Sequence, residues 1–196
     1  MKEIHPLSSY QKYYAQDFSD EELARDWTLS PGDKTEVSKY QPEYQAFIAT
    51  QICALRIYGV FLTHLTSLSP RIVNYLNRQL KLPPSLGITI SQRKMTYHQH
   101  LRRIMRYLGF KKFTETAQKE LTAWISQQAQ QGRLPAELLG QVSSFLVARR
   151  ILLPGASVIK RLVNRTCAKV HEGVFKKLYC NAPQNLDHLV RVSEVS

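Results

Sequence analysis

The stretch from Ser91 to Phe113 reads SQRKMTYHQHLRRIMRYLGFKKF and predicts a basic amphipathic helix. Four apolar residues recur every three or four positions, which places them on one helix face: Tyr97, Leu101, Ile104 and Leu108. Gly109 has the position of a C-terminal stop. No acid interrupts the seven basic residues, which are Arg93, Lys94, Arg102, Arg103, Arg106, Lys111 and Lys112. One side should pack and the other should face either a polyanion or only solvent.

Charge is divided unevenly along the 196 residues, whose formal net charge is +12 and whose pI is about 9.8. Residues 1–50 carry five Lys/Arg and nine Asp/Glu, whereas residues 51–196 carry 22 and six. Between Tyr44 and Thr114 there are eleven Lys/Arg and no carboxylate. Such segregation favours a polyanionic partner, with nucleic acid ahead of a membrane surface.

Helical periodicity dominates the chain and strand signals are nearly absent, so we expect an all-α, multi-helix bundle. Cap signatures predict helix starts at Ser19, Ser30-Pro31, Pro42, Ser69-Pro70, Thr114, Pro135 and Ser157. The first two helices are compatible with a helix-turn-helix. Because Leu82-Pro83-Pro84 breaks the pattern, we expect two tandem helical lobes, an N-terminal lobe (1–84) and a basic lobe (85–181). Residues 182–196 would form a tail or the start of a linker.

The longest predicted helix, which begins at Ser157 and ends near Cys180, carries a second basic row. Its apolar stripe comprises Ile159, Val163, Cys167, Val170, Val174 and Leu178. Opposite this stripe lie Arg161, Arg165, Lys169 and Lys176, interrupted by Glu172. A row at this spacing can follow a phosphate backbone, although it would also suit an ordinary solvated face. Arg149 and Arg150 are expected in the last turn of the preceding helix, where they complement its dipole.

Other kinds of site find little support in the sequence. Two short histidine pairings, His98 with His100 and Cys167 with His171, lack the further ligands that a structural zinc requires. No nucleophile elbow, Walker loop or dinucleotide fingerprint occurs, and the acids beyond residue 43 are scattered. We therefore expect no catalysis, metal or cofactor.

The expected location is a reducing cytoplasm. Three cysteines without a CxxC pair fit free thiols. No span of about 20 apolar residues and no secretion signal are visible, so no membrane partner is expected.

Five segments, in this order, resemble the N-terminal region of the Tn-three family of large replicative bacterial transposases. They are FSDEELARDWTLSPGD (18–33), QICALRIYGVF (51–61), YHQHLRRIMRYLGFKKF (97–113), LVARRILLPGASVIKRLV (146–163) and LDHLVRV (186–192). LLPG before a long basic helix and the H…LR…LGF block are the more specific of these. The chain departs from the family before the second segment, where an arginine-rich run is usual and residues 38–50 contain only Lys39.

The resemblance implies a helical module that binds the terminal inverted repeats of a transposon as double-stranded DNA. Cutting and joining would belong to a distant C-terminal RNase-H-like domain, expected to be absent here, and the protein would be associated with the bacterial nucleoid. The residues expected to contact DNA are Arg93, Lys94, His98, Gln99, Arg102, Arg103, Arg106, Lys111, Lys112, Arg149, Arg150, Lys160, Arg161, Arg165 and Lys169. Those from His98 to Arg106 would reach base edges if their helix enters the major groove.

Two alternatives remain open at this point. A truncated transposase fragment could act as a regulatory module that binds a second copy or a full-length transposase, with weak or no DNA binding. An RNA-binding helical protein would also use basic helices, although no RNA-specific module motif is visible.

Overall fold

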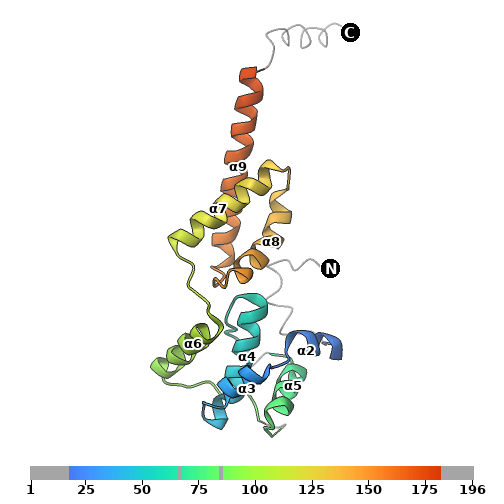
Figure 1. Ribbon diagram of the computed structural model, residues 1–196, viewed down its shortest axis with the longest axis vertical. Helices are drawn as coiled ribbons and strands as arrows, with labels where there is room; N and C mark the ends of the chain where they lie inside the picture. The colour runs from blue at the N-terminus through green and yellow to red at the C-terminus, as the bar shows by residue number, and fades with distance from the viewer. Residues whose placement is uncertain (1–17, 66–67, 84–85, 182–196) are drawn as a thin grey trace.

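Residues 18–65, 68–83 and 86–181 are described by the structure, a computed structural model, and form eight α-helices without a strand (Figure 1). The helices are α2 (Asp20–Asp26), α3 (Pro31–Val37), α4 (Pro42–Tyr58), α5 (Pro70–Leu80), α6 (Lys94–Leu108), α7 (Glu115–Gln130), α8 (Pro135–Ala148) and α9 (Ala156–Asn181). The predicted all-α fold is confirmed. None of the helices in these ranges is long and apolar enough to cross a membrane. The segment LDHLVRV lies outside the described residues.

Local hydrogen bonds explain most helix boundaries. At the start of α2, the Ser19 hydroxyl accepts the Glu22 N–H (3.2 Å) and the Glu22 carboxylate accepts the Ser19 N–H (3.0 Å). Ser30 and Asp33 form the same reciprocal pair at α3. Gly59 ends α4 and Gly109 ends α6, both as predicted and both with positive φ (69° and 71°).

Two expected caps differ from the structure. Ser69 stands at the N-cap of α5 but makes no side-chain capping bond, so Pro70, with its fixed φ, marks this helix start. The last helix begins at Ala156 rather than Ser157, and the Gly155 carbonyl accepts the N–H groups of Val158 and Ile159.

The first hydrophobic core is built around α4, in which every residue from Ala46 to Leu55 is buried. Helices α3, α5 and α6 pack on α4, and Trp27 and Leu23 close the core from the α2 side (Figure 1). Burial on all sides accounts for the weakly amphipathic sequence of α4.

Helix α6 belongs to this first core, whereas the sequence analysis assigned it to the second lobe. Ile104 is fully buried there, Phe110 is nearly so, and Tyr97, Leu101 and Leu108 pack against the same cluster. The chain passes from the first core to the second after Phe110, some 25 residues later than the predicted division at 84/85. Helix α5 ends at Leu80, but the first core continues through α6 to Phe110.

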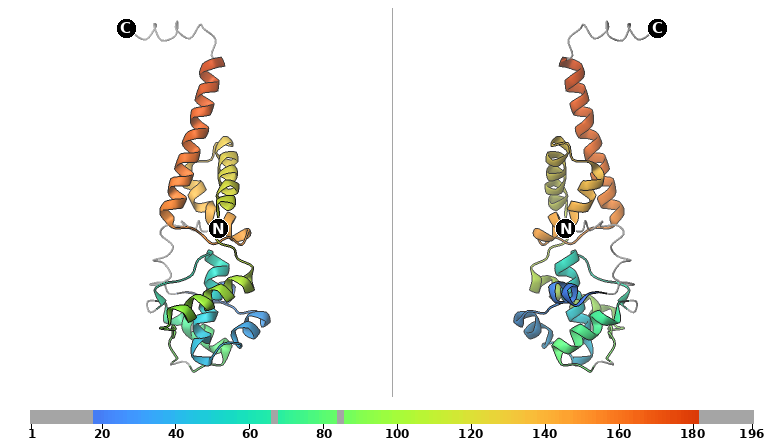
Figure 2. Two further views of the ribbon diagram at one scale, coloured as in Figure 1. Left: turned by 90° about the vertical axis from the view of Figure 1, so that its left-hand side faces the viewer. Right: turned by 90° about the vertical axis from the view of Figure 1, so that its right-hand side faces the viewer.

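The second core lies between α7, α8 and α9. Leu121, Ile125, Leu138, Val142 and Val163 are fully buried in it. The second half of α9 continues beyond the ends of α7 and α8, as the two side views also show (Figure 2). All residues from His171 to Lys177 are exposed, which fits a helix that has left its bundle.

The two cores meet at a short joint, here called the lobe junction, formed by Gly59, residues 109–111 and residues 147–153. The Lys111 N–H donates to the Arg150 carbonyl (2.8 Å) and the Leu152 N–H donates to the Lys111 carbonyl (2.9 Å). The Leu153 N–H donates to the Gly59 carbonyl (2.9 Å). A side chain at Gly59 would force its neighbours to shift, because an added Cβ would lie 2.4 Å from Leu153 Cδ1 and 2.8 Å from Val147 Cγ2.

Candidate nucleic-acid interface

Helix α6 presents two faces of opposite character. Its inner face, with Ile104, Leu101 and His100, packs on α4. Its outer face carries exposed side chains at positions that fall on the side opposite Ile104: Met95, His98, Gln99, Arg102 and Arg106. None of these outer side chains forms an ion pair with a residue that the structure describes, and Met95 is 72% exposed. The outer face is therefore available to a partner.

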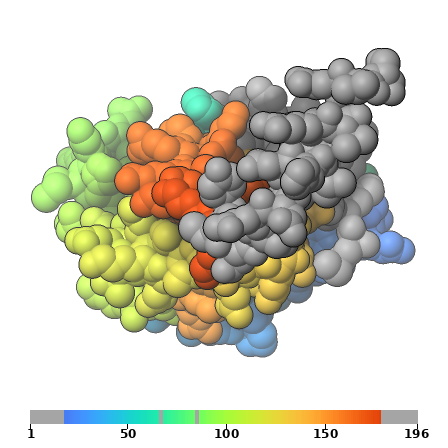
Figure 3. Space-filling model, turned by 90° about the horizontal axis from the view of Figure 1, so that it is seen from above, coloured from blue at the N-terminus to red at the C-terminus, as the bar shows by residue number. Residues whose placement is uncertain are grey.

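In the view from above, the green spheres of the α6 region reach beyond the helices of the second lobe (Figure 3). The second lobe therefore leaves this part of the first lobe uncovered. Arg103 lies at the flank of α6, nearer to Tyr40 and His100. Burial raises the pKa of Tyr40, and the charge of Arg103 only partly offsets this effect.

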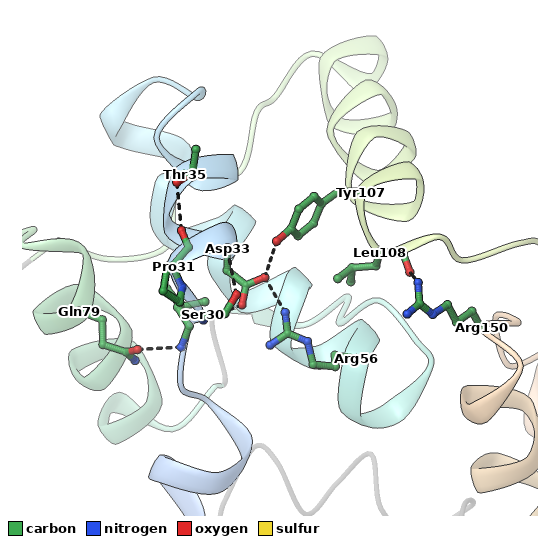
Figure 4. Close-up of polar contacts among 10 residues, drawn as sticks. Ser30, Pro31, Asp33, Thr35, Arg56, Gln79, Tyr107, Leu108 and Arg150 are labelled. Carbon is green, nitrogen blue, oxygen red and sulfur yellow. Dashed lines mark hydrogen bonds and ion pairs between the residues drawn. The ribbon is translucent and has the colours of Figure 1, made fainter.

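A buried carboxylate ties α6 to the rest of the first lobe (Figure 4). Asp33 has no exposed surface and its Oδ1 accepts hydrogen bonds from Arg56 Nη2 (2.5 Å) and Tyr107 Oη (2.9 Å). Burial would raise the pKa of Asp33, but hydrogen bonds from Arg56, Ser30 and Tyr107 outweigh it and hold that pKa below its usual value. One charged group thus joins α3, α4 and α6 and fixes the orientation of α6.

A ring of aromatic side chains surrounds His100 at the α4–α6 contact. Its imidazole lies 5.3 Å from the rings of Tyr40 and Tyr44 and 6.3 Å from that of Phe47, measured between centroids. Burial, with the charge of Arg103, lowers the pKa of His100. His100 therefore packs as a neutral aromatic residue.

The arginine pair after α8 serves the fold, but at a different position and through different contacts from the expected place in the last helical turn. Both residues lie just past the helix, which ends at Ala148. The Arg149 guanidinium stacks 3.7 Å above the Phe145 ring centroid. Arg150 has a left-handed backbone (φ 55°) and its Nη1 donates to the Leu108 carbonyl (3.1 Å), which caps the end of α6 (Figure 4). Their exposed positions still allow contact with an anion, but each has a structural partner.

On α9, four of the predicted residues are exposed: Lys160, Arg161, Arg165 and Lys169. Arg161, Arg165 and Lys169 lie opposite the buried stripe of Ile159, Val163 and Cys167, as predicted. Lys176, further along this row, pairs with Glu172 (2.8 Å). The α9 row therefore offers three aligned, exposed cations, none of which forms an ion pair within 4.0 Å with a residue that the structure describes.

The structure divides the fifteen predicted residues among three places. Arg93, Lys94 and the residues from His98 to Arg106 lie on or beside α6 in the first lobe. Lys111, Lys112, Arg149 and Arg150 lie at or beside the lobe junction, and Lys160, Arg161, Arg165 and Lys169 lie on α9 in the second lobe. All fifteen are exposed, but they do not form one patch on one helix pair.

A depression of about 520 Å³ beside the lobe junction does not suit a polyanion. Residues 60–64 and 152–156 line it, and they include no lysine or arginine. Among the described residues, no group of three or more His, Cys, Asp and Glu side chains could hold a metal ion.

One basic surface was missed by the sequence analysis. Helix α5 packs Ile72 and Leu76 on α4 and exposes Asn74, Arg78 and, just after the helix, Lys81. The sequence does contain a signal for this basic surface, because α5 lies within the carboxylate-free region between Tyr44 and Thr114.

Comparison with known proteins relates nearly the whole chain to one group. Residues 8–166 match the family described as "Domain of unknown function (DUF4158)". The transposase for transposon gamma-delta of Escherichia coli (strain K12) is 27% identical over 185 residues, which are 88% of this chain and 18% of that protein. The transposase for transposon Tn1546 of Enterococcus faecium is 27% identical over 150 residues (76% and 15%). The transposase for transposon Tn501 of Pseudomonas aeruginosa is 24% identical over 178 residues (90% and 18%).

The chain thus spans less than a fifth of the length of these relatives. The family match spans the first four of the segments on which the resemblance was based, and the comparisons confirm that resemblance at modest identity. The chain belongs to the DUF4158 family and is related over most of its length to transposases of the Tn-three family.

Proposed function

We propose that this chain is a DNA-binding module of a Tn-three family transposase that recognises the terminal inverted repeats of the transposon. The observation that carries the proposal is the outer face of α6. It is exposed, carries no acid, forms no ion pair with the described part of the chain, and is held in place from behind by the first core and the Asp33 network.

The two kinds of DNA contact divide between the helices. Arg102 and Arg106, with His98 and Gln99, project from one rigid helix face, which is the arrangement needed to reach base edges in the major groove. The α9 row of Arg161, Arg165 and Lys169 suits phosphates, which position the protein without reading sequence. Most of the affinity would come from phosphates and would depend on salt.

The test is fluorescence anisotropy with an inverted-repeat duplex and a scrambled duplex, at about 50 mM and about 200 mM salt. The wild-type chain should prefer the inverted repeat at both concentrations. The double variant Arg102→Ala/Arg106→Ala should lose most of that preference, since one bidentate base contact discriminates by about 1–3 kcal/mol.

Arg133→Ala is the matched control, because Arg133 is exposed in the turn between α7 and α8, outside the proposed surfaces. Circular dichroism should show the same helix content in all variants. Equal binding of both duplexes by the wild-type chain would refute inverted-repeat recognition. Equal effects of the double variant and the control would remove α6 from the interface.

We further propose that strand cutting belongs to another part of a longer transposase. The structure describes four acids beyond residue 43, and all four are exposed. They lie on three different helices: Glu115 and Glu120 on α7, Glu137 on α8 and Glu172 on α9. Such spacing does not resemble a metal-binding carboxylate cluster. A nicking assay with Mg²⁺ on an inverted-repeat duplex should show no cleavage by this chain alone.

A protein-interaction role is the second candidate, and the distal part of α9 favours it. Val174 is 46% exposed and Phe175 is 71% exposed on a helix that has left its bundle. Together these two neighbouring side chains would supply apolar area for a contact with another protein. Co-purification with a full-length transposase in the absence of DNA, lost in Val174→Ser/Phe175→Ser, would support this role.

A further inference from the structure

Helix α5 separates its polar side chains into two groups. The inward group is used by the fold. Gln79 accepts the Leu29 N–H (2.8 Å) and donates to the Trp27 carbonyl (3.0 Å), and the Asn77 amide donates to the Leu86 carbonyl (2.8 Å). The Tyr75 hydroxyl contacts that of Thr28 (2.8 Å). These contacts hold α5 against the residues that follow α2 and against the segment that follows α5.

The outward group has no such role. Asn74, Arg78 and Lys81 are exposed, and their side chains make no hydrogen bond or ion pair with any residue that the structure describes. Their spacing of four and three residues aligns them along one edge of the helix. Arg71, at the start of the same edge, differs because it pairs with Asp20 (2.7 Å). The edge is therefore a row of free donors without an acid inside it.

Lys81 adds an independent observation, which is its backbone conformation. It ends α5 with φ 57°, in the left-handed region where α4 and α6 have Gly59 and Gly109. The Lys81 N–H donates to the Arg78 carbonyl (3.3 Å) and the Leu82 N–H to the Asn77 carbonyl (2.9 Å), a helix end that glycine closes without strain. The other non-glycine residue with positive φ in the described ranges, Arg150, caps α6 with its side chain. The Lys81 side chain makes no comparable contact within the described ranges, so its strain needs another reason.

We propose that Asn74, Arg78 and Lys81 form a second DNA-contact surface, carried by the first lobe and separate from α6. This inference rests on the proposed function and names duplex DNA as the ligand. Arg78 and Lys81 would contact phosphates, and the Asn74 amide could donate to a phosphate or a base edge. The first lobe would thereby present two separate surfaces to DNA, one on α6 and one on the α5 edge.

The strained lysine permits a test that separates binding from folding. Lys81→Gly removes one charge and relieves the backbone, so Tm should rise by about 2–4 °C. The same variant should bind the duplex about three- to tenfold more weakly and reduce the salt slope of log K by about 0.9, the value for one phosphate. A residue with only a structural role would not shift stability and affinity in opposite directions.

Two further variants complete the experiment. Lys81→Asn tolerates the left-handed conformation and should weaken binding to the same extent as Lys81→Gly. Arg78→Ala should weaken binding with little change in Tm, because its guanidinium has no partner in the fold. Arg133→Ala again controls for the loss of one charge.

The outcomes distinguish the two proposals. If the wild-type chain and Arg133→Ala bind the duplex with the same affinity as the Lys81 and Arg78 variants, only the α5 surface is refuted. If the wild-type chain binds no duplex, both proposals fail. The α5 proposal would also be overturned if the Lys81 and Arg78 variants bound an RNA duplex more weakly than the wild-type chain but bound the DNA duplex with unchanged affinity.

Discussion

Replacing Gly59 with alanine should destabilise the chain through two separable effects. Gly59 has φ 69°, and a left-handed L-residue costs about 1–2 kcal/mol. The added Cβ would also lie 2.4 Å from Leu153 Cδ1 and 2.8 Å from Val147 Cγ2. Overpacking of this kind costs about 1–3 kcal/mol. The total expected loss in the free energy of unfolding is therefore about 2–5 kcal/mol.

Gly132 provides the matched control. It also has positive φ (84°), but an added Cβ there would meet nothing within 4 Å. Gly132→Ala should therefore lose only the conformational part, about 1–2 kcal/mol. Gly109→Ala should fall between the two, because its Cβ would approach Arg150 Nη1 at 3.0 Å and that side chain can move. The order of stability should be Gly132→Ala, then Gly109→Ala, then Gly59→Ala.

Urea unfolding followed by tryptophan fluorescence measures these differences. The chain has two tryptophans, one in each core, and Trp124→Phe leaves Trp27 as the reporter of the first core. If Gly59→Ala lowers the free energy of unfolding by no more than Gly132→Ala does, the steric argument is refuted. A second check is Leu153→Ala in the Gly59→Ala background, which should recover about 1 kcal/mol relative to additivity because it removes the clashing atom.

Three other outcomes follow from single side chains. Tyr107→Phe should lower the free energy of unfolding by about 1.5–3 kcal/mol, because it removes a hydrogen bond to the buried Asp33 carboxylate, and urea titration would detect it. The pKa of His100 is lowered in the folded chain, so the unfolded chain binds its proton first. The free energy of unfolding should keep its maximum contribution from His100 above the ordinary pKa of 6.5 and should fall as the pH drops towards the folded pKa. Urea titrations of His100→Phe over the same pH range should not show this loss. Burial raises the pKa of Cys53 to about 12, so mass spectrometry should find Cys53 unmodified by iodoacetamide at about pH 8 until the chain unfolds.

Local signals made most of the fold predictable. Ser19, Ser30, Thr114, Gly59 and Gly109 act within one turn of themselves, so their capping roles can be read from sequence. Local signals do not predict which core a helix packs against. The apolar face of α6 was recognised, but the same face would fit either core, and its packing on α4 depends on tertiary contacts.

The candidate site shows the same limit. Exposure of the α6 and α9 cations follows from helical periodicity and was predictable. The specific contacts of Arg149 and Arg150 were not predictable, because Arg150 contacts the carbonyl of Leu108, 42 residues earlier in the chain. Asp33 gave no signal beyond its capping position, since its contact with Tyr107 joins residues 74 apart. Among basic residues, sequence identified which can face solvent but not which the fold already uses.

The length of α9 has a mechanical consequence. A helix of 26 residues is about 39 Å long, and its base adjoins the lobe junction at residues 147–153. A rotation of the whole second lobe by about 10° at that base would move the far end of α9 by about 7 Å. A small change where Leu153 meets Gly59 would thus be amplified at the end of α9 far from the first lobe (Figure 1).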